Sequence, residues 1–279
     1  MRLCVALLAA ALLALAAAPA EASYYVALGD SLARGWQPGS DGHSHDTDRG
    51  YVDGVARSLA ATHHGLTTVK LGCPGETAES MLDGGPCGYA HGTQMRQAEA
   101  VLRKRRGHLA AVTVNIGDND VERCVHRTAV DEDCANRELA VVRNRLPRIA
   151  RRLRAAAGPG VPIVGLTDYD QFLAFWLRGA AGRKVARRSV AIVLRLNQAA
   201  DAIYSDAGLL FADASDRFAT AELDRLVTLR GHGRVPLAVA RVCTWTWACS
   251  DPPIGFNDHA NATGYRVLAR VVIAALHAA

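Results

Sequence analysis

A serine, an asparagine and a histidine are the residues of this sequence best suited to chemistry. Ser31 ends the motif Gly29-Asp30-Ser31, Asn119 lies in Gly117-Asp118-Asn119-Asp120, and His259 lies near the carboxyl terminus. A serine hydroxyl becomes a nucleophile when a neutral imidazole takes its proton. The tetrahedral intermediate that follows carries an oxyanion, which needs fixed hydrogen-bond donors. These residue types therefore suit acyl transfer, with Ser31 as nucleophile and His259 as general base.

Three donors are available for the oxyanion: the backbone N–H of Ser31, the backbone N–H of Gly75 and the side-chain amide of Asn119. A glycine at position 75 lets a substrate approach the backbone closely. The alternative is that Asp30 and Ser31 only cap a helix. The Gly-Asp-Ser motif by itself does not decide between the two, because short motifs often match by chance.

The elements that must position these residues alternate along the chain. Short apolar runs predict strands near 24–29, 67–71, 110–116, 161–166 and 209–212. Helical patterns cover 51–64, 94–106, 136–157, 183–206 and 260–278. A break or kink is expected at Pro147, within the third of these. An irregular stretch covers 226–256. Alternation of this kind predicts a parallel sheet with helices on both faces. Ser31, Gly75 and Asn119 each follow a predicted strand, so they should meet at the edge where open α/β sheets bind ligands.

Residues 1–22 have the composition of a secretory signal peptide. A basic start is followed by an Ala- and Leu-rich run and by Ala20-Glu21-Ala22, an A-x-A cleavage site. We expect cleavage after Ala22, an extracellular protein, and one domain over residues 23–279. No later segment is apolar enough for membrane insertion.

The charge of the chain is modest. The net charge is +5, and the basic runs fall in helical patterns, where they indicate solvated faces. They lack the interleaved aromatics of a nucleic-acid-binding module, so no nucleic-acid partner is expected. We expect a monomer.

Six cysteines remain after the signal peptide, and an even number in an exported chain indicates disulfides. Fifteen pairings are possible. Grouping along the sequence favours three local links: Cys73–Cys87, Cys124–Cys134 and Cys243–Cys249. None of the pairs has the C-x-x-C spacing of a zinc site.

The blocks containing Ser31, Gly75, Asn119 and His259, in this order and spacing, resemble those of the SGNH (GDSL-type) esterases and lipases. The resemblance is greatest to secreted actinobacterial members, which also carry three sequential disulfides. It implies a flavodoxin-like, three-layer α/β/α sandwich with a five-stranded parallel sheet. It also implies Ser31 as nucleophile, His259 as base, and an oxyanion hole formed by Ser31, Gly75 and Asn119. No cofactor or metal is expected.

One position departs from the family pattern. The family usually has Asp three residues before the catalytic histidine, and Phe256 stands there in this chain. The group that orients His259 is then the backbone carbonyl of Phe256, which we favour, or the carboxylate of Asp251 or Asp258. Asp258 also fits a helix N-cap.

Two further groups of residues have alternative interpretations. A metal site is conceivable at His43, His45, Asp46 and Asp48, but a polar surface loop is the better interpretation. Aromatic side chains that would suit an acyl pocket, or equally the core, are Trp36, Trp245, Trp247 and Phe256.

The sequence therefore predicts a secreted serine esterase or lipase acting on a small-molecule or lipid ester. One alternative is the same fold acting on another acyl donor, as a phospholipase, thioesterase or carbohydrate deacetylase, which an acyl-chain panel would separate. A second is a non-catalytic binding module, for which Phe256 is the only argument. Such a module would not react with a fluorophosphonate.

Overall fold

The computed structural model describes residues 22–278 and is built around a five-stranded parallel sheet. Residues 1–21 of the predicted signal peptide lie outside the described residues. The strand order is β4-β1-β5-β6-β7, and the strands are β1 (Tyr24–Gly29), β4 (Thr67–Lys70), β5 (Leu109–Asn115), β6 (Ile163–Leu166) and β7 (Leu210–Ala212). Counted along the chain this is the order 2-1-3-4-5 of flavodoxin-like sheets, whose switch point lies between the first and third strands. The predicted α/β fold is confirmed.

Strand β1 shows why these residues form a sheet with two covered faces. Tyr25, Val26, Ala27 and Leu28 are all fully buried. Successive side chains of a strand point to opposite faces. Accordingly Val26 and Leu28 join one hydrophobic core, whereas Tyr25 and Ala27 join the other. A nearly continuous apolar run is what a parallel strand covered on both sides requires.

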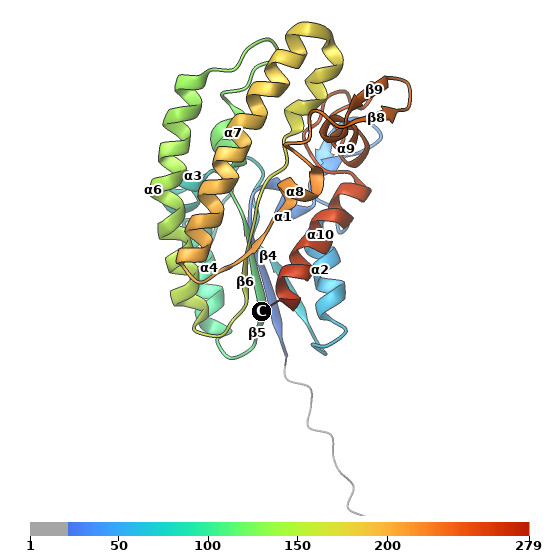
Figure 1. The fold of residues 1–279 in the computed structure, drawn as a ribbon. Coiled ribbons are helices and arrows are strands. Elements are labelled where there is room, and N and C mark those ends of the chain that lie inside the picture. The colour runs from blue at the N-terminus through green and yellow to red at the C-terminus, as the bar shows by residue number, and fades with distance from the viewer. Residues whose placement is uncertain (1–21, 279) are drawn as a thin grey trace, which may run out of the picture.

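Helices form the two outer layers (Figure 1). One layer consists of α3 (Ala78–Asp83), α4 (Gln94–Lys104), α6 (Glu132–Ala157) and α7 (Gly179–Asp206), and the other is built on α2 (Tyr51–Leu59) and α10 (Ala262–His277). Short elements fill the loops: α1 (Ser31–Arg34), β2 (Gln37–Pro38), β3 (Ser44–His45), α5 (Asp118–Glu122), the 3-10 helix η1 (Gln171–Arg178), α8 (Ala214–Phe218), β8 (Leu226–Leu229), β9 (Gly233–Pro236) and α9 (Leu237–Trp245). The sandwich therefore has three layers.

Two regions differ from the sequence-based expectations. Helix α6 continues through Pro147 without ending, because the packed layer holds it on both sides of the proline. The stretch 226–256 is not wholly irregular: it contains the β8–β9 hairpin and α9. Short antiparallel pairs and helices of this kind have weak sequence signals, since their stability comes from packing.

Three disulfides join the cysteines that are neighbours in the sequence: Cys73–Cys87, Cys124–Cys134 and Cys243–Cys249. The first encloses the segment that contains Gly75, and the third lies ten residues before His259. Each therefore closes a loop near a predicted site residue or on its flank. Between residues 22 and 278, none of the helices has the length and apolarity that a membrane crossing requires.

Candidate active site

Ser31 stands at a sharp turn between β1 and α1. Gly29 has φ +129°, and a Cβ there would lie 2.0 Å from the carbonyl oxygen of Asn115, so no other residue fits. Asp30 caps α1 by accepting a hydrogen bond from the N–H of Leu32 at 2.9 Å. Ser31 is the first residue of the helix and is 9% exposed. The turn therefore caps the helix and presents Ser31 at the carboxyl edge of the sheet.

A buried glutamine, Gln94, bonds to the backbone of this turn. The amide of Gln94 accepts from the N–H of Gly29 at 2.8 Å and donates to the carbonyl of Gly29 at 2.9 Å. The same amide nitrogen lies 3.0 Å from a carboxylate oxygen of Glu76. Gln94 thus connects the turn before Ser31 to the segment that follows Gly75. This role was not predicted from the sequence, in which Gln94 is an ordinary polar helix position.

The segments around Gly75 and Asn119 are also joined. Gly75 is exposed with φ +79°, and a Cβ at this position would meet no heavy atom closer than 4.0 Å, so its backbone is open to a ligand. The side-chain amide of Asn119 donates to the carbonyl of Glu76 at 3.1 Å. A carboxylate oxygen of Asp120 accepts from the N–H of Ala78 at 2.9 Å. These bonds hold the loops after β4 and β5 in a fixed relation.

His259 lies at the same edge, in the loop before α10, and is 9% exposed. Its Nδ1 lies 3.0 Å from Oδ1 of Asp258 and 3.0 Å from Oδ1 of Asn257. Two acceptors at Nδ1 favour the tautomer that carries its proton there, which leaves Nε2 as the basic atom. Nε2 is buried and has no hydrogen-bond partner among residues 22–278. An imidazole held in this way can act as a general base through Nε2.

Among the three orienting groups expected for His259, these contacts favour Asp258 over the carbonyl of Phe256. The backbone carbonyl of Phe256 was the favoured partner of His259, but the structure places Asp258 and Asn257 at Nδ1. Asn257 is placed by a local turn: its Oδ1 also accepts from the backbone N–H of His259 at 3.1 Å, which folds its side chain back onto the ring. Asp251 lies on the exposed part of the loop. Asn257 was missed, although an Asn two residues before a histidine is a signal for such a turn.

Ser31, Asn119 and His259 line one small pocket, together with Tyr169 and Gln171. Its open volume is about 20 Å³, which is close to the space that one water molecule occupies. Gly75 is not among the lining residues, but its neighbour Glu76 holds Asn119. Five carboxylates also line the pocket: Asp30, Asp118, Glu122, Asp168 and Asp258.

The carboxylates of this pocket differ in protonation. Burial, followed by the nearby charge of Asp168, raises the pKa of Asp30 and Asp118 well above the usual range. Burial and the charge of Asp258 raise the pKa of Glu122 to about 7. Asp258 moves in the other direction: burial alone would raise its pKa, but the hydrogen bond and charge of His259 lower it. Asp258, the carboxylate at the imidazole, is thus the one whose pKa is lowered.

The other predicted groups lie elsewhere. Trp245 packs edge-on against Phe218, with ring centroids 5.2 Å apart, and contacts the hydrophobic core that contains Tyr25 and Ala27. His43 and His45 lie in or beside the β2–β3 hairpin, where His45 is exposed. Within residues 22–278, no group of three or more His, Cys, Asp or Glu side chains is arranged to hold a metal ion.

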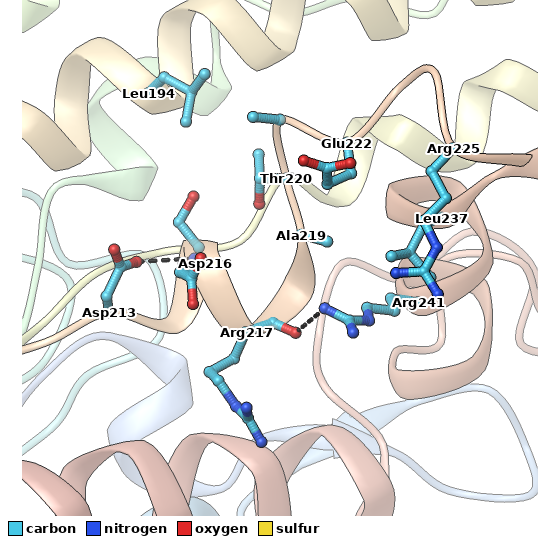
Figure 2. Close-up of a pocket in the computed structure, with 12 residues that line it drawn as sticks. Leu194, Asp213, Asp216, Arg217, Ala219, Thr220, Glu222, Arg225, Leu237 and Arg241 are labelled. Atoms are coloured by element: carbon cyan, nitrogen blue, oxygen red, sulfur yellow. Dashed lines mark hydrogen bonds between the residues drawn. The ribbon is translucent and has the colours of Figure 1, made fainter.

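A second hollow lies between α7, α8 and α9, away from the predicted catalytic residues (Figure 2). Asp213 and Asp216 stand on one side and Arg225 and Arg241 on the other. Two of these charged side chains already bond within the fold: Asp213 caps α8, and Arg241 donates to the carbonyl of Arg217 at 2.7 Å. None of its lining residues belongs to the pocket of Ser31.

Solved structures similar to this chain are hydrolases. An extracellular lipase from Streptomyces rimosus matches 91% of this chain and 100% of its own, with 21% identity and a TM-score of 0.56. A phospholipase A1 from Streptomyces albidoflavus NA297 matches 91% and 99%, with 19% identity and a TM-score of 0.52. An acetyl-xylooligosaccharide esterase from Geobacillus stearothermophilus matches 92% and 96%, with 17% identity and a TM-score of 0.52.

These likenesses establish the fold. No curated protein matches the sequence. The model of the GDSL-like lipase/acylhydrolase family matches residues 27–267, which include Ser31, Gly75, Asn119 and His259. The match spans most of the chain. The protein is therefore a member of the GDSL-like lipase/acylhydrolase family.

Proposed function

We propose that this protein is an exported serine hydrolase of carboxylic esters. The observation that carries the proposal is the single pocket shared by Ser31, Asn119 and His259, with Asp258 at the far nitrogen of the imidazole. Acyl transfer needs a hydroxyl nucleophile, an imidazole base with its proton on Nδ1 and a donor to the oxyanion, and all three lie in this one pocket. Family membership supports the same chemistry.

In the proposed reaction Oγ of Ser31 attacks the ester carbonyl while Nε2 of His259 takes its proton. The oxyanion accepts hydrogen bonds from the N–H groups of Ser31 and Gly75 and from the amide of Asn119. The intermediate expels the alkoxide, which takes the proton from Nε2, and leaves an acyl group on Ser31. Water, deprotonated at Nε2, then attacks the acyl group, and the second tetrahedral intermediate releases the acid while Nε2 returns the proton to Oγ of Ser31.

The ionised Asp258 stabilises the imidazolium formed in both steps. Its lowered pKa and its 3.0 Å distance from Nδ1 support this role. Asn257 supplies a neutral acceptor at the same atom. Asp258 and Asn257 therefore replace the carboxylate that the family usually has at the position of Phe256.

Ser31→Ala tests the proposal with a short 4-nitrophenyl ester. We expect its hydrolysis to fall to the background rate while the circular dichroism spectrum stays unchanged, because only the hydroxyl is lost. Ser40→Ala, at an exposed serine outside the pocket, is the matched control and should retain full activity. Full activity of Ser31→Ala would overturn the mechanism.

Export is the second part of the proposal. The composition of residues 1–22 and the three disulfides support a signal peptide followed by a catalytic domain over residues 23–279 that works in an oxidising environment. Sequencing the amino terminus of the protein recovered from culture medium should show a chain that begins at Ser23.

A further inference from the structure

The pocket of Ser31 is too small to hold a substrate. Its open volume of about 20 Å³ accommodates the reacting carbonyl and little else. The rest of an ester must therefore lie outside the pocket, in a space that adjoins the reacting atoms. A groove of about 560 Å³ meets this condition, because it shares Asn119 and Glu122 with the pocket. Its size falls in the range of ligand-binding clefts.

The wall of this groove is aromatic. Phe172, Phe175 and Phe256 line it and contact one another, with centroid distances of 5.0 Å between Phe175 and Phe256 and 5.7 Å between Phe172 and Phe175. Phe172 and Phe175 are almost completely buried, whereas Phe256 is half-buried. Packed rings with a partly exposed member offer a firm apolar surface for a ring or a short alkyl segment.

Phe256 stands at the position where related enzymes usually have the aspartate that orients the histidine. In this chain Asp258 and Asn257 contact Nδ1 of His259, so position 256 is free of that role. Its side chain instead joins Phe172 and Phe175 in the groove. The departure from the family pattern thus places an apolar side chain, Phe256, in the wall of the groove, three residues before His259 in the sequence.

The rim of the groove is basic. Arg123, His126 and Arg127 line it, and Glu122 is the only acidic lining residue. Arg123 is engaged, since it lies 3.2 Å from Glu138 and donates to the carbonyl of Asp120. Arg127 is exposed and has no ion-pair or hydrogen-bond partner among residues 22–278. Its guanidinium is therefore available to an anionic group at the outer end of the groove.

We infer that this groove binds the acyl group of the substrate and selects an apolar, ring-sized acyl body with an anionic far end. The inference rests on the proposed function. The groove is assigned to the acyl side because it borders Asn119, the donor to the oxyanion, and does not include His259, toward which the leaving oxygen must face.

Three esters that share the 4-nitrophenyl leaving group test the inference: those of acetic acid, 4-phenylbutyric acid and 4-(4-carboxyphenyl)butyric acid. We expect the wild type to have a higher kcat/KM for both ring-bearing esters than for the acetate. Phe256→Ala and the milder Phe175→Leu should lower the kcat/KM ratio of phenylbutyrate to acetate by about tenfold and severalfold, respectively. An unchanged ratio in both folded variants would overturn the acyl assignment.

The charged end is tested by Arg127→Gln. The ratio of carboxyphenylbutyrate to phenylbutyrate should fall about threefold, the size expected for one exposed charge pair. Arg143→Gln, an exposed position on α6 outside the groove, is the control and should leave the ratio unchanged. An unchanged ratio in Arg127→Gln would overturn the anionic preference. Acetate hydrolysis that persists in Ser31→Ala would instead overturn the proposed function, and the inference with it.

Discussion

The orientation of His259, the proposed general base, depends on two neighbouring side chains. Oδ1 of Asp258 and Oδ1 of Asn257 both lie 3.0 Å from Nδ1 of His259. The amide of Asn257 is itself held, because its nitrogen donates to Oγ of Ser44 at 3.0 Å. This bond directs the amide oxygen, and not its nitrogen, toward the imidazole. The carboxylate supplies charge, and the amide keeps the ring in the right tautomer.

Asp258→Asn separates these two contributions. We expect kcat/KM to fall about 10- to 100-fold, less than the roughly 10⁴-fold loss seen where a histidine is left in the wrong tautomer. Loss of the carboxylate makes the imidazolium less stable, so the acidic limb of the pH–rate profile should move to lower pH. The measurement is kcat/KM from pH 4 to 9.

The control for this variant is Asp251→Asn, which changes an exposed carboxylate of the same loop. Its pH–rate profile should match that of the wild type. A profile of Asp258→Asn that keeps its acidic limb in place would show that Asp258 does not act on His259.

At the scale of single residues, the sequence predicted which side chains would meet, and it gave Asp258 as an alternative to the favoured orienting group, the carbonyl of Phe256. Ser31, Asn119 and His259 do share a pocket. The positions of Asp258 and Asn257 depend on a turn of three residues, in which either a carbonyl or a side chain can face the ring. Only the folded loop decides between them, so the sequence could not choose Asp258 over the carbonyl of Phe256.

At the scale of elements, the site is built from loops that bond to one another. Gln94 on α4 pairs with both backbone groups of Gly29, and it is 1% exposed. The carbonyl of Gly29 also accepts from the N–H of Cys73, but its N–H bonds to Gln94, and a buried N–H without a partner would cost about 1–3 kcal/mol. The glutamine therefore stabilises the turn that presents Ser31, although it does not line the pocket.

Gln94→Leu should lower the free energy of unfolding by about 1–3 kcal/mol, because it leaves the buried N–H of Gly29 unpaired, whereas the carbonyl of Gly29 keeps the N–H of Cys73. Urea unfolding followed by tryptophan fluorescence measures this change. Gln97→Leu, three residues along the same helix, is the matched control and should change stability by less than about 1 kcal/mol. Equal losses in the two variants would contradict the role of Gln94.

The sequence pattern located the strands that carry these loops but not the bonds between the loops. Each strand is marked by a local apolar run. Gln94, by contrast, lies 65 residues from Gly29, and its position on α4 is that of a polar helix residue. Contacts over such separations have no local signal. The β8–β9 hairpin and α9 were not predicted for another reason, since they are short elements whose stability comes from packing.

At the scale of the whole molecule, several acidic groups are buried. Burial is the largest cause that raises the pKa of Asp120, Glu122 and Asp170 to about 7 and that of Asp168 to about 6. In the unfolded chain such groups titrate near pH 4. Between about pH 4 and 7 the native state therefore holds more protons than the unfolded state.

The protein should thus be more stable at pH 5 than at pH 7.5, since stability falls with rising pH wherever the native state binds more protons. The lowered pKa of Asp258 acts in the opposite sense, but only at pH values below the usual carboxylate range. Differential scanning calorimetry across this pH range measures the effect. Asp170→Asn, which removes one buried acid that bonds to Ser189, should flatten the pH dependence. A melting temperature that rises from pH 5 to 7.5 would contradict this account.

The overall architecture was the most predictable part of the molecule. Five apolar runs alternating with amphipathic helices are compatible with few topologies, because crossovers are right-handed and parallel strands must be covered on both faces. The observed sheet places β1 beside β5, and the loops after these two strands carry Ser31 and Asn119. The long apolar core is thus what brings distant polar residues to one edge.

The central claim is that Ser31 is the nucleophile and His259 its base. Mass spectrometry of the protein after reaction with a fluorophosphonate tests it most directly. We predict one adduct, on the peptide that contains Ser31, formed much more slowly in His259→Ala and not at all in Ser31→Ala. An adduct on another residue, or an unreactive wild-type protein, would contradict the claim.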